Sequence, residues 1–374
     1  NCSGVFFMLE KFEKIREFSP EFFAGANSAE GFFSCFDSLY DPEKDSFYIL
    51  KGGPGTGKST LMKRLSEKLY GKGEVPELFY CSSDPDSLDA VRFLKAHSGI
   101  ADGTAPHVMD PIYPGVCERV VALGDCFDCE KLGKSRKELT ELYKACTRLH
   151  KKASRFIRAA GSLADDSFSA DCACVDFDKA AEFAERLCDK FLGKKIEGEG
   201  KQRKAFLSGI TPKGLVTFSK TPQKLCRRVV VIEDAFGGAS SVIMSVIEAR
   251  VRRLGLDAVI CPCALNPSRK IDHVLIPEKD IAFCTAAPGI KIDTDNKIIH
   301  AKRFENTAEL GRFSSRLRFN KRASAELLKS ASAILAQAKA VHDQIEKRYV
   351  EAMDFTKQTA MGDSIFGDIK SRLK

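Results

Sequence analysis

Tryptophan is absent from this 374-residue chain, and so is any apolar run of the ~20 residues that a helix needs to cross a bilayer. The short run at residues 5–9 is followed at once by Glu10 and Lys11, so it is too short for the apolar core of a secretory signal. We therefore expect no membrane segment and a cytoplasmic location.

Basic clusters are also missing. The 59 Lys and Arg residues exceed the 51 Asp and Glu residues by only 8, and the basic residues occur in consecutive runs of at most two. Nucleic-acid-binding segments usually concentrate positive charge, so nucleic acid is an unlikely partner. A hydrophobic content of 44% and a charged content of 29% are typical of a globular protein, and the length allows two domains.

The 14 cysteines lack the pattern of a zinc site. Three closely spaced pairs occur, Cys126 with Cys129, Cys172 with Cys174, and Cys261 with Cys263. Zinc sites usually need two such pairs with loop flanks, and none of these pairs is followed by a matching His pair. Without an export signal we expect reduced thiols, and we interpret most of them as small buried hydrophobes.

A glycine-rich motif is what the sequence does contain. Residues 52–60 read GGPGTGKST, which fits the phosphate-binding pattern G-x-x-x-x-G-K-[ST] called Walker A. The apolar run at 47–50 predicts a strand before it, and the spacing of apolar residues over 61–69 predicts a helix after it. Strand, loop and helix in this order are the context that the motif requires.

Each residue type in the motif has a physical role. Glycines let the backbone curl with its N–H groups inward, and the helix N-terminus adds partial positive charge. Lys58 would reach the terminal phosphates, and the Ser59 hydroxyl would bind Mg²⁺. The motif therefore predicts that the chain binds a nucleoside triphosphate. The expected nucleotide-binding residues are Gly52, Gly53, Pro54, Gly55, Thr56, Gly57, Lys58, Ser59 and Thr60.

Three segments of the chain recur at a nearly constant distance. Residues 23–32 resemble 206–215 at an offset of 183, residues 81–85 resemble 263–267 at 182, and residues 100–105 resemble 281–286 at 181. Such offsets indicate a duplicated unit of about half the chain. We therefore divide the chain into a first unit, 1–195, and a second unit, 196–374.

In the second unit the corresponding segment lacks the lysine that the phosphate-binding motif requires. The offset places residues 233–241, EDAFGGASS, opposite the glycine-rich motif, with Ala239 opposite Lys58. Glu233 and Asp234 bring negative charge to a loop that would have to bind phosphate. We therefore predict that the second unit keeps the fold and binds no nucleotide.

Amphipathic stretches follow each predicted core. Apolar residues recur at steps of three and four over 139–160, 177–191 and 328–352. We predict an antiparallel helical hairpin added to each core. The hairpins would either cover the core or reach a protein partner as short coiled coils. His342 lies on the last stripe, and we interpret it as a packed histidine.

Carboxylates after predicted strands are the catalytic candidates. Residues 98–102 end in Asp102, the position from which Mg²⁺ is held in phosphate-loop enzymes. Asp84 and Asp89 follow a strand predicted at 78–81, and one of them could orient the attacking water, although residues 84–86 also suit a turn.

Three further side chains are candidates for the same site. His107 could face the γ-phosphate, although a loop contact is the simpler interpretation. Arg92 or Arg119 could supply charge to a transition state, and nothing in the sequence selects between them.

Several of these segments together resemble a known family. The 52–60 loop with CSSD at 81–84, DGTAPH at 102–107 and the glycine-containing segment at 206–214 is similar to a family of uncharacterised bacterial ATPases with two tandem P-loop NTPase units on one chain. Residues 346–355 resemble its C-terminal helical region, so the likeness covers nearly the whole chain. The resemblance implies a P-loop fold with ATP and Mg²⁺ as ligands, and it brings no known substrate. The family's second unit often keeps a Gly-Lys-Ser/Thr loop, and this chain departs from that pattern.

We thus predict an α/β protein of two duplicated P-loop NTPase-type cores, each a mostly parallel sheet with flanking helices and an added hairpin. The expected function is Mg²⁺-dependent ATP hydrolysis at the first unit. Lys58 would stabilise phosphate charge, Ser59 and Asp102 would place Mg²⁺, and an acid near Asp84 would position water. The second unit would be structural or regulatory.

Two alternatives remain open. A P-loop kinase acting on a small molecule or nucleotide would share the ATP site and would need a lid of arginines, for which Arg312, Arg316 and Arg318 are candidates. A nucleotide-gated protein-interaction module would use the helical hairpins to bind its partner.

Overall fold

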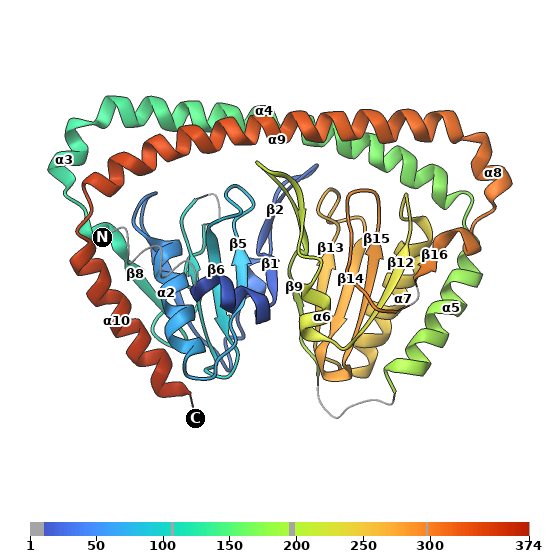
Figure 1. The fold of residues 1–374 in the computed structure, drawn as a ribbon, viewed down its shortest axis with the longest axis horizontal. Coiled ribbons are helices and arrows are strands. Elements are labelled where there is room, and N and C mark those ends of the chain that lie inside the picture. Colours follow the sequence, from blue (N-terminus) through green and yellow to red (C-terminus); the bar gives the residue numbers. More distant parts are fainter. Residues whose placement is uncertain (1–10, 106–107, 194–198, 297, 374) are drawn as a thin grey trace. The chain divides into compact units, whose positions relative to one another are not determined.

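The chain forms two compact units. The structure, a computed structural model, describes residues 11–105, 108–193, 199–296 and 298–373. Unit 1 comprises Asn1–Gly25, Ser34–Lys151 and Ile334–Lys374, whereas unit 2 comprises Ala26–Phe33 and Lys152–Ala333. Each unit is built around a six-stranded sheet (Figure 1).

The sheet of unit 1 is mostly parallel. Its strands are β1 (Glu21–Phe23), β4 (Ser46–Lys51), β5 (Glu77–Tyr80), β6 (Leu88–Phe93), β7 (Ser98–Asp102) and β8 (Glu118–Ala122). They lie in the order β1-β5-β6-β7-β4-β8, and only β6 runs antiparallel to its neighbours. The central strands are buried along nearly their whole length, as apolar runs in a sheet covered by helices should be.

The sheet of unit 2 has the same topology. Its strands are β9 (Gln202–Lys204), β12 (Arg228–Glu233), β13 (Ala258–Pro262), β14 (Ile271–Ile276), β15 (Ile281–Ala286) and β16 (Ile299–His300). They lie in the order β9-β13-β14-β15-β12-β16, and β14 is the antiparallel strand. The α/β class and the mostly parallel sheets are therefore confirmed, and the matching strand orders are those expected of a duplicated core.

Helices flank each sheet. In unit 1, α2 (Lys58–Tyr70) lies against the sheet (Figure 1) and buries the apolar stripe that the sequence predicts. Helix α10 (Phe355–Arg372) packs on α2, where a Cβ on Gly362 would lie 2.5 Å from Leu61 Cδ1. The missing side chain of Gly362 thus lets the two helices approach closely.

Unit 2 repeats this arrangement with other segments. Helix α7 (Gly238–Leu254) packs against α5 (Phe177–Phe191), which buries small residues on one face. Arg250 of α7 donates to Asp189 Oδ1 of α5 at 2.8 Å. The stretch predicted as the second hairpin arm of the first sequence unit therefore covers the core of unit 2.

Two long helices, α4 (Arg136–Cys172) and α9 (Ser314–Glu351), pair with each other rather than with their sequence neighbours. In unit 1 the Cys146 thiol is 3.8 Å from Ala338 O, and in unit 2 the Ser324 hydroxyl donates to Ala160 O at 3.2 Å. The helical assignment of these stretches is confirmed, but the predicted pairing of hairpin arms is wrong. The Gly-, Asp- and Ser-containing stretch after residue 160, expected to form the hairpin turn, lies inside α4 instead. Gly161 packs closely there, since a Cβ on it would lie 2.3 Å from Ala29 Cβ.

Short elements complete the units. They include the β2–β3 pair (Gly25–Ser28 and Gly31–Ser34), the β10–β11 hairpin (Ser208–Thr211 and Gly214–Thr217), α3 (Cys129–Lys134), α6 (Thr221–Leu225) and α8 (Thr307–Arg312). Within the described residues, 3₁₀ turns lie at Phe36–Ser38, Leu123–Cys126, Pro277–Lys279 and Ala301–Phe304. Residues 11–18 are also helical.

The division predicted at 195/196 separates the strands of the two sheets but not the compact units. Helix α5 precedes that point and belongs to unit 2, and α10 follows it and belongs to unit 1. None of the helices in the described part of the chain is long and apolar enough to cross a membrane.

Candidate functional site

The glycine-rich loop joins β4 to α2 in unit 1. Gly55 and Gly57 have φ angles of +71° and +75°, a region that favours glycine, and Gly57 is the N-cap of α2. The buried Thr56 hydroxyl donates to Gly53 O at 3.0 Å and closes the loop on itself. The first N–H groups of α2 have no carbonyl partner within the helix, so they give the loop anion-binding character.

Lys58 is buried at the first position of α2. Its ammonium donates to Gly52 O at 2.7 Å and to Gly53 O at 2.8 Å. The ammonium also lies 3.4 Å from Asp102 Oδ2. Only 8% of the lysine is exposed. The carbonyls of the loop and the Asp102 carboxylate thus hold the charged ammonium group of Lys58 inside the loop.

Asp102 lies where the sequence predicts, at the end of β7. It is opposite Leu50 of the neighbouring strand β4, and its Oδ1 accepts a hydrogen bond from Thr104 N at 2.9 Å. The Ser59 hydroxyl oxygen accepts from Leu88 N at 3.0 Å, so its contact is with the start of β6. The structure therefore brings Asp102 to Lys58, while Ser59 is held by β6.

Asp84 lies in a turn and contacts α9. Its Oδ2 accepts from the Ser87 hydroxyl at 2.9 Å and lies 3.3 Å from Lys339 Nζ. Asp89 is buried on β6, and burial together with this neighbouring carboxylate raises the pKa of Cys81. Of the two acids proposed to orient water, Asp84 is the more accessible.

The end of α9 covers the glycine-rich loop, which the sequence reasoning missed. A Cβ on Gly55 would lie 2.6 Å from Glu346 O, and a Cβ on Gly53 would lie 3.0 Å from Tyr349 Cε1. The Gln358 amide of α10 donates to Gly57 O at 3.5 Å. Residues some 300 positions away in the sequence therefore form the outer wall of the loop.

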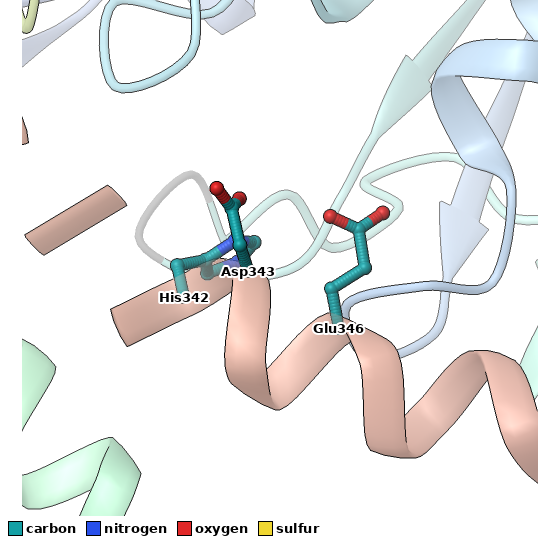
Figure 2. A group of neighbouring side chains, drawn as sticks. All are labelled: His342, Asp343 and Glu346. Atoms are coloured by element: carbon teal, nitrogen blue, oxygen red, sulfur yellow. The ribbon is translucent and has the colours of Figure 1, made fainter. Parts of the chain in front are cut away.

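A group of possible metal ligands lies on the same part of α9. Figure 2 shows His342 beside Asp343, with Asp343 and Glu346 projecting from the same side of the helix. One ligand atom of each lies within 4.8 Å of the others. His342 is exposed, so its interpretation as a packed histidine is wrong. The ammonium of Lys339 already neutralises Asp343 at 2.8 Å.

The arginine candidates make structural contacts. Arg92 pairs with Glu77 at 3.0 Å within the sheet, and Arg119 lies 3.2 Å from Asp368 of α10. Arg316, a candidate for a kinase lid, forms an ion pair with Asp166 in the pairing of α9 with α4. Another candidate, His107, lies outside the described residues.

The corresponding loop of unit 2 is built differently. Four residues separate β12 from the start of α7, against six between β4 and α2. Gly237 is the N-cap with φ of +98°, so the structure places Gly238, rather than Ala239, at the first helical position that Lys58 takes in unit 1.

A carboxylate of the chain itself fills this second loop. Asp234 Oδ1 accepts from Phe236 N at 3.1 Å and from Gly237 N at 2.7 Å, and its Oδ2 accepts from Ser240 N at 2.8 Å. The N–H groups that would bind a phosphate in such a loop are thus already occupied by an anion.

The cysteines between Cys35 and Cys284 have free thiols, and most of them are buried. Their interpretation as small buried hydrophobes is confirmed.

Comparison of the chain with protein-family models, with curated proteins and with solved structures found no match.

Proposed function

We propose that unit 1 binds ATP in the loop formed by residues 52–60. The buried Lys58 ammonium, held inside a curled loop at a helix N-terminus, is the observation that carries this proposal. A lysine at this position can leave the carbonyls of Gly52 and Gly53 for phosphate oxygens, and the exchange replaces two neutral acceptors by a charged one.

Mg²⁺ is the metal that the neighbouring oxygen atoms suit. Asp102 supplies a carboxylate and Ser59 a hydroxyl, both hard oxygen ligands. Bound there with ATP, the ion would neutralise charge on the β- and γ-phosphates. Asp102 and Ser59 would hold the ion, and Lys58, now 3.4 Å from Asp102, would bind the phosphates instead.

Mg²⁺-dependent hydrolysis is the activity that we propose for this site. Asp84 would position the attacking water, and Lys339 would hold that carboxylate in place through the 3.3 Å contact. The second unit would be structural or regulatory, because the Asp234 carboxylate takes its loop amides.

A nucleotide-gated interaction module is the second candidate, and the contact of α9 with the loop favours it. Glu346 and Tyr349 of α9 lie directly against the loop, so a phosphate bound there would be close to this helix. Movement of α9 would then report nucleotide binding along the helix to a protein partner.

Thermal unfolding with and without MgATP tests the binding proposal. At ~100 times its dissociation constant, a ligand of the folded state adds about 2.7 kcal/mol. The wild-type protein should therefore melt at a higher temperature with MgATP, and Lys58→Ala should lose most of this shift. Lys72→Ala, a change at an exposed lysine just after α2, should keep it. No shift in the wild type at millimolar MgATP would refute the proposal.

Single-turnover measurements separate the activities. Release of phosphate without any acceptor supports an ATPase. Turnover that appears only when a small-molecule fraction of cell extract is added would favour a kinase instead.

A further inference from the structure

We propose that unit 2 binds one hard divalent cation, such as Mg²⁺ or Mn²⁺, between the carboxylates of Asp171, Asp234 and Glu305. One oxygen of each carboxylate lies within 4.8 Å of the others. This site goes beyond the proposed ATP site, because it lies in the other unit and needs no nucleotide.

Three separate elements bring these acids together. Asp171 lies in the last turn of α4, Asp234 follows β12, and Glu305 follows the 3₁₀ turn Ala301–Phe304. Asp171 and Asp234 are 0% and 1% exposed, and Glu305 is partly exposed. The site is therefore enclosed by protein on one side and reachable from solvent through Glu305.

The Asp171 carboxylate has an unused oxygen. Its Oδ2 accepts from Gly238 N at 2.8 Å, whereas its Oδ1 is buried without a hydrogen-bond partner among the described residues. A buried polar atom left without a partner destabilises the folded protein, and more so when it is charged. A cation bound to Oδ1 would remove that cost.

The nearby ammonium group of Lys270 already pairs with another carboxylate, that of Asp272. A Cβ on Gly237 would lie 2.9 Å from Lys270 Nζ, so this lysine is beside the loop, but its ammonium also lies 3.0 Å from Asp272. Burial and the neighbouring Asp234 raise the pKa of Asp171 to about 7, with a smaller contribution from Glu305. The acids thus repel one another in the absence of a further cation.

The ligand atoms determine the class of metal. Three carboxylate oxygens suit Mg²⁺, Mn²⁺ or Ca²⁺, which complete their coordination with water. The thiols of Cys172 and Cys174 lie close in sequence to Asp171, but burial raises the pKa of both, which disfavours the thiolate that a softer metal needs.

Unit 1 has no such acids at the corresponding positions. Tyr349 approaches its loop at Gly53, as Asp171 approaches Gly238, and Tyr349 packs on Phe127 with ring centroids 5.2 Å apart. Phe127 and Glu305 each follow a 3₁₀ turn and form an isolated bridge with the segment after a long helix. An aromatic contact in one unit is thus replaced by a pair of acids in the other, which indicates a function particular to unit 2.

Equilibrium dialysis with Mn²⁺, read by electron paramagnetic resonance on nucleotide-free protein, tests the site. The wild type should bind one Mn²⁺ per chain. Asp171→Asn, which keeps an oxygen to accept from Gly238 N, and Glu305→Gln should each weaken this binding at least tenfold. The control Asp343→Asn alters the exposed His342, Asp343 and Glu346 group on α9 and should leave Mn²⁺ binding unchanged.

Folding of the variants is checked by circular dichroism, and Glu305→Gln serves if Asp171→Asn is unstable, because Glu305 is partly exposed. The proposal is overturned if the wild type binds no Mn²⁺ at millimolar concentration, if both variants bind as the wild type does, or if Asp343→Asn alone removes the ion.

Discussion

Replacement of Gly55 by alanine tests whether α9 rests on the glycine-rich loop. A Cβ at this position would lie 2.6 Å from Glu346 O and 3.1 Å from Val350 N, both backbone atoms of α9. Backbone atoms cannot turn aside as the end of a flexible side chain can, so the last turns of α9 would have to shift.

Gly57→Ala is the matched control. Its φ of +75° is close to the +71° of Gly55, so both substitutions carry the same backbone strain of about 1 kcal/mol. At Gly57 the nearest atom to an added Cβ is Gln358 Nε2, at an ordinary 3.4 Å. Overpacking costs about 1–3 kcal/mol, so Gly55→Ala should destabilise the protein by that much more than Gly57→Ala does.

Urea unfolding followed by circular dichroism measures this difference. The midpoint for Gly55→Ala should lie below that for Gly57→Ala. If the two variants unfold at the same urea concentration, then α9 does not cover the loop, and the proposal that nucleotide binding moves this helix fails with it.

Three further predictions address acid stability, helix packing and catalysis. Burial lowers the pKa of His273 to about 4. Between pH 6.5 and 4 this imidazole is therefore protonated in the unfolded chain but stays neutral in the folded protein. This contribution to stability is complete above pH 6.5, and about 3 kcal/mol of it is lost as the pH falls toward 4. Urea titrations across this range should therefore show a greater loss of stability in the wild type than in His273→Gln. Gly362→Ala, whose Cβ would collide with Leu61, should lower the melting temperature, whereas Gly367→Ala, which meets nothing within 4 Å, should not. Asp102→Asn should slow ATP hydrolysis more than it weakens ATP binding, and hydrolysis at the wild-type rate would move the Mg²⁺ role to another acid.

The sequence predicted the surroundings of the glycine-rich loop well because they are local. The strand expected at 47–50 is part of β4 (Ser46–Lys51), and the helix expected at 61–69 is part of α2 (Lys58–Tyr70). The loop ends and the helix begins at Gly57 and Lys58, because the N-cap takes a left-handed backbone conformation that glycine adopts without strain. The position of Asp102 followed in the same way from the end of a strand.

Other features depend on contacts between distant residues and could not be predicted. The contact of Glu346 with Gly55 joins segments that no local pattern relates. In unit 2 the sequence offset suggested that Asp234 would repel a phosphate, but the shorter loop lets this side chain bind the loop N–H groups itself. The meeting of Asp171 with Glu305 likewise arises only from the tertiary fold.

Calorimetric titration of the protein with a non-hydrolysable ATP analogue and Mg²⁺ is the most direct test of the central claim, that one of the two repeated units keeps a nucleotide site. We expect one nucleotide per chain in the wild type, since Asp234 fills the second loop, and almost no binding in Lys58→Ala. A ratio of two, or a Lys58→Ala variant that binds as tightly as the wild type, would contradict it.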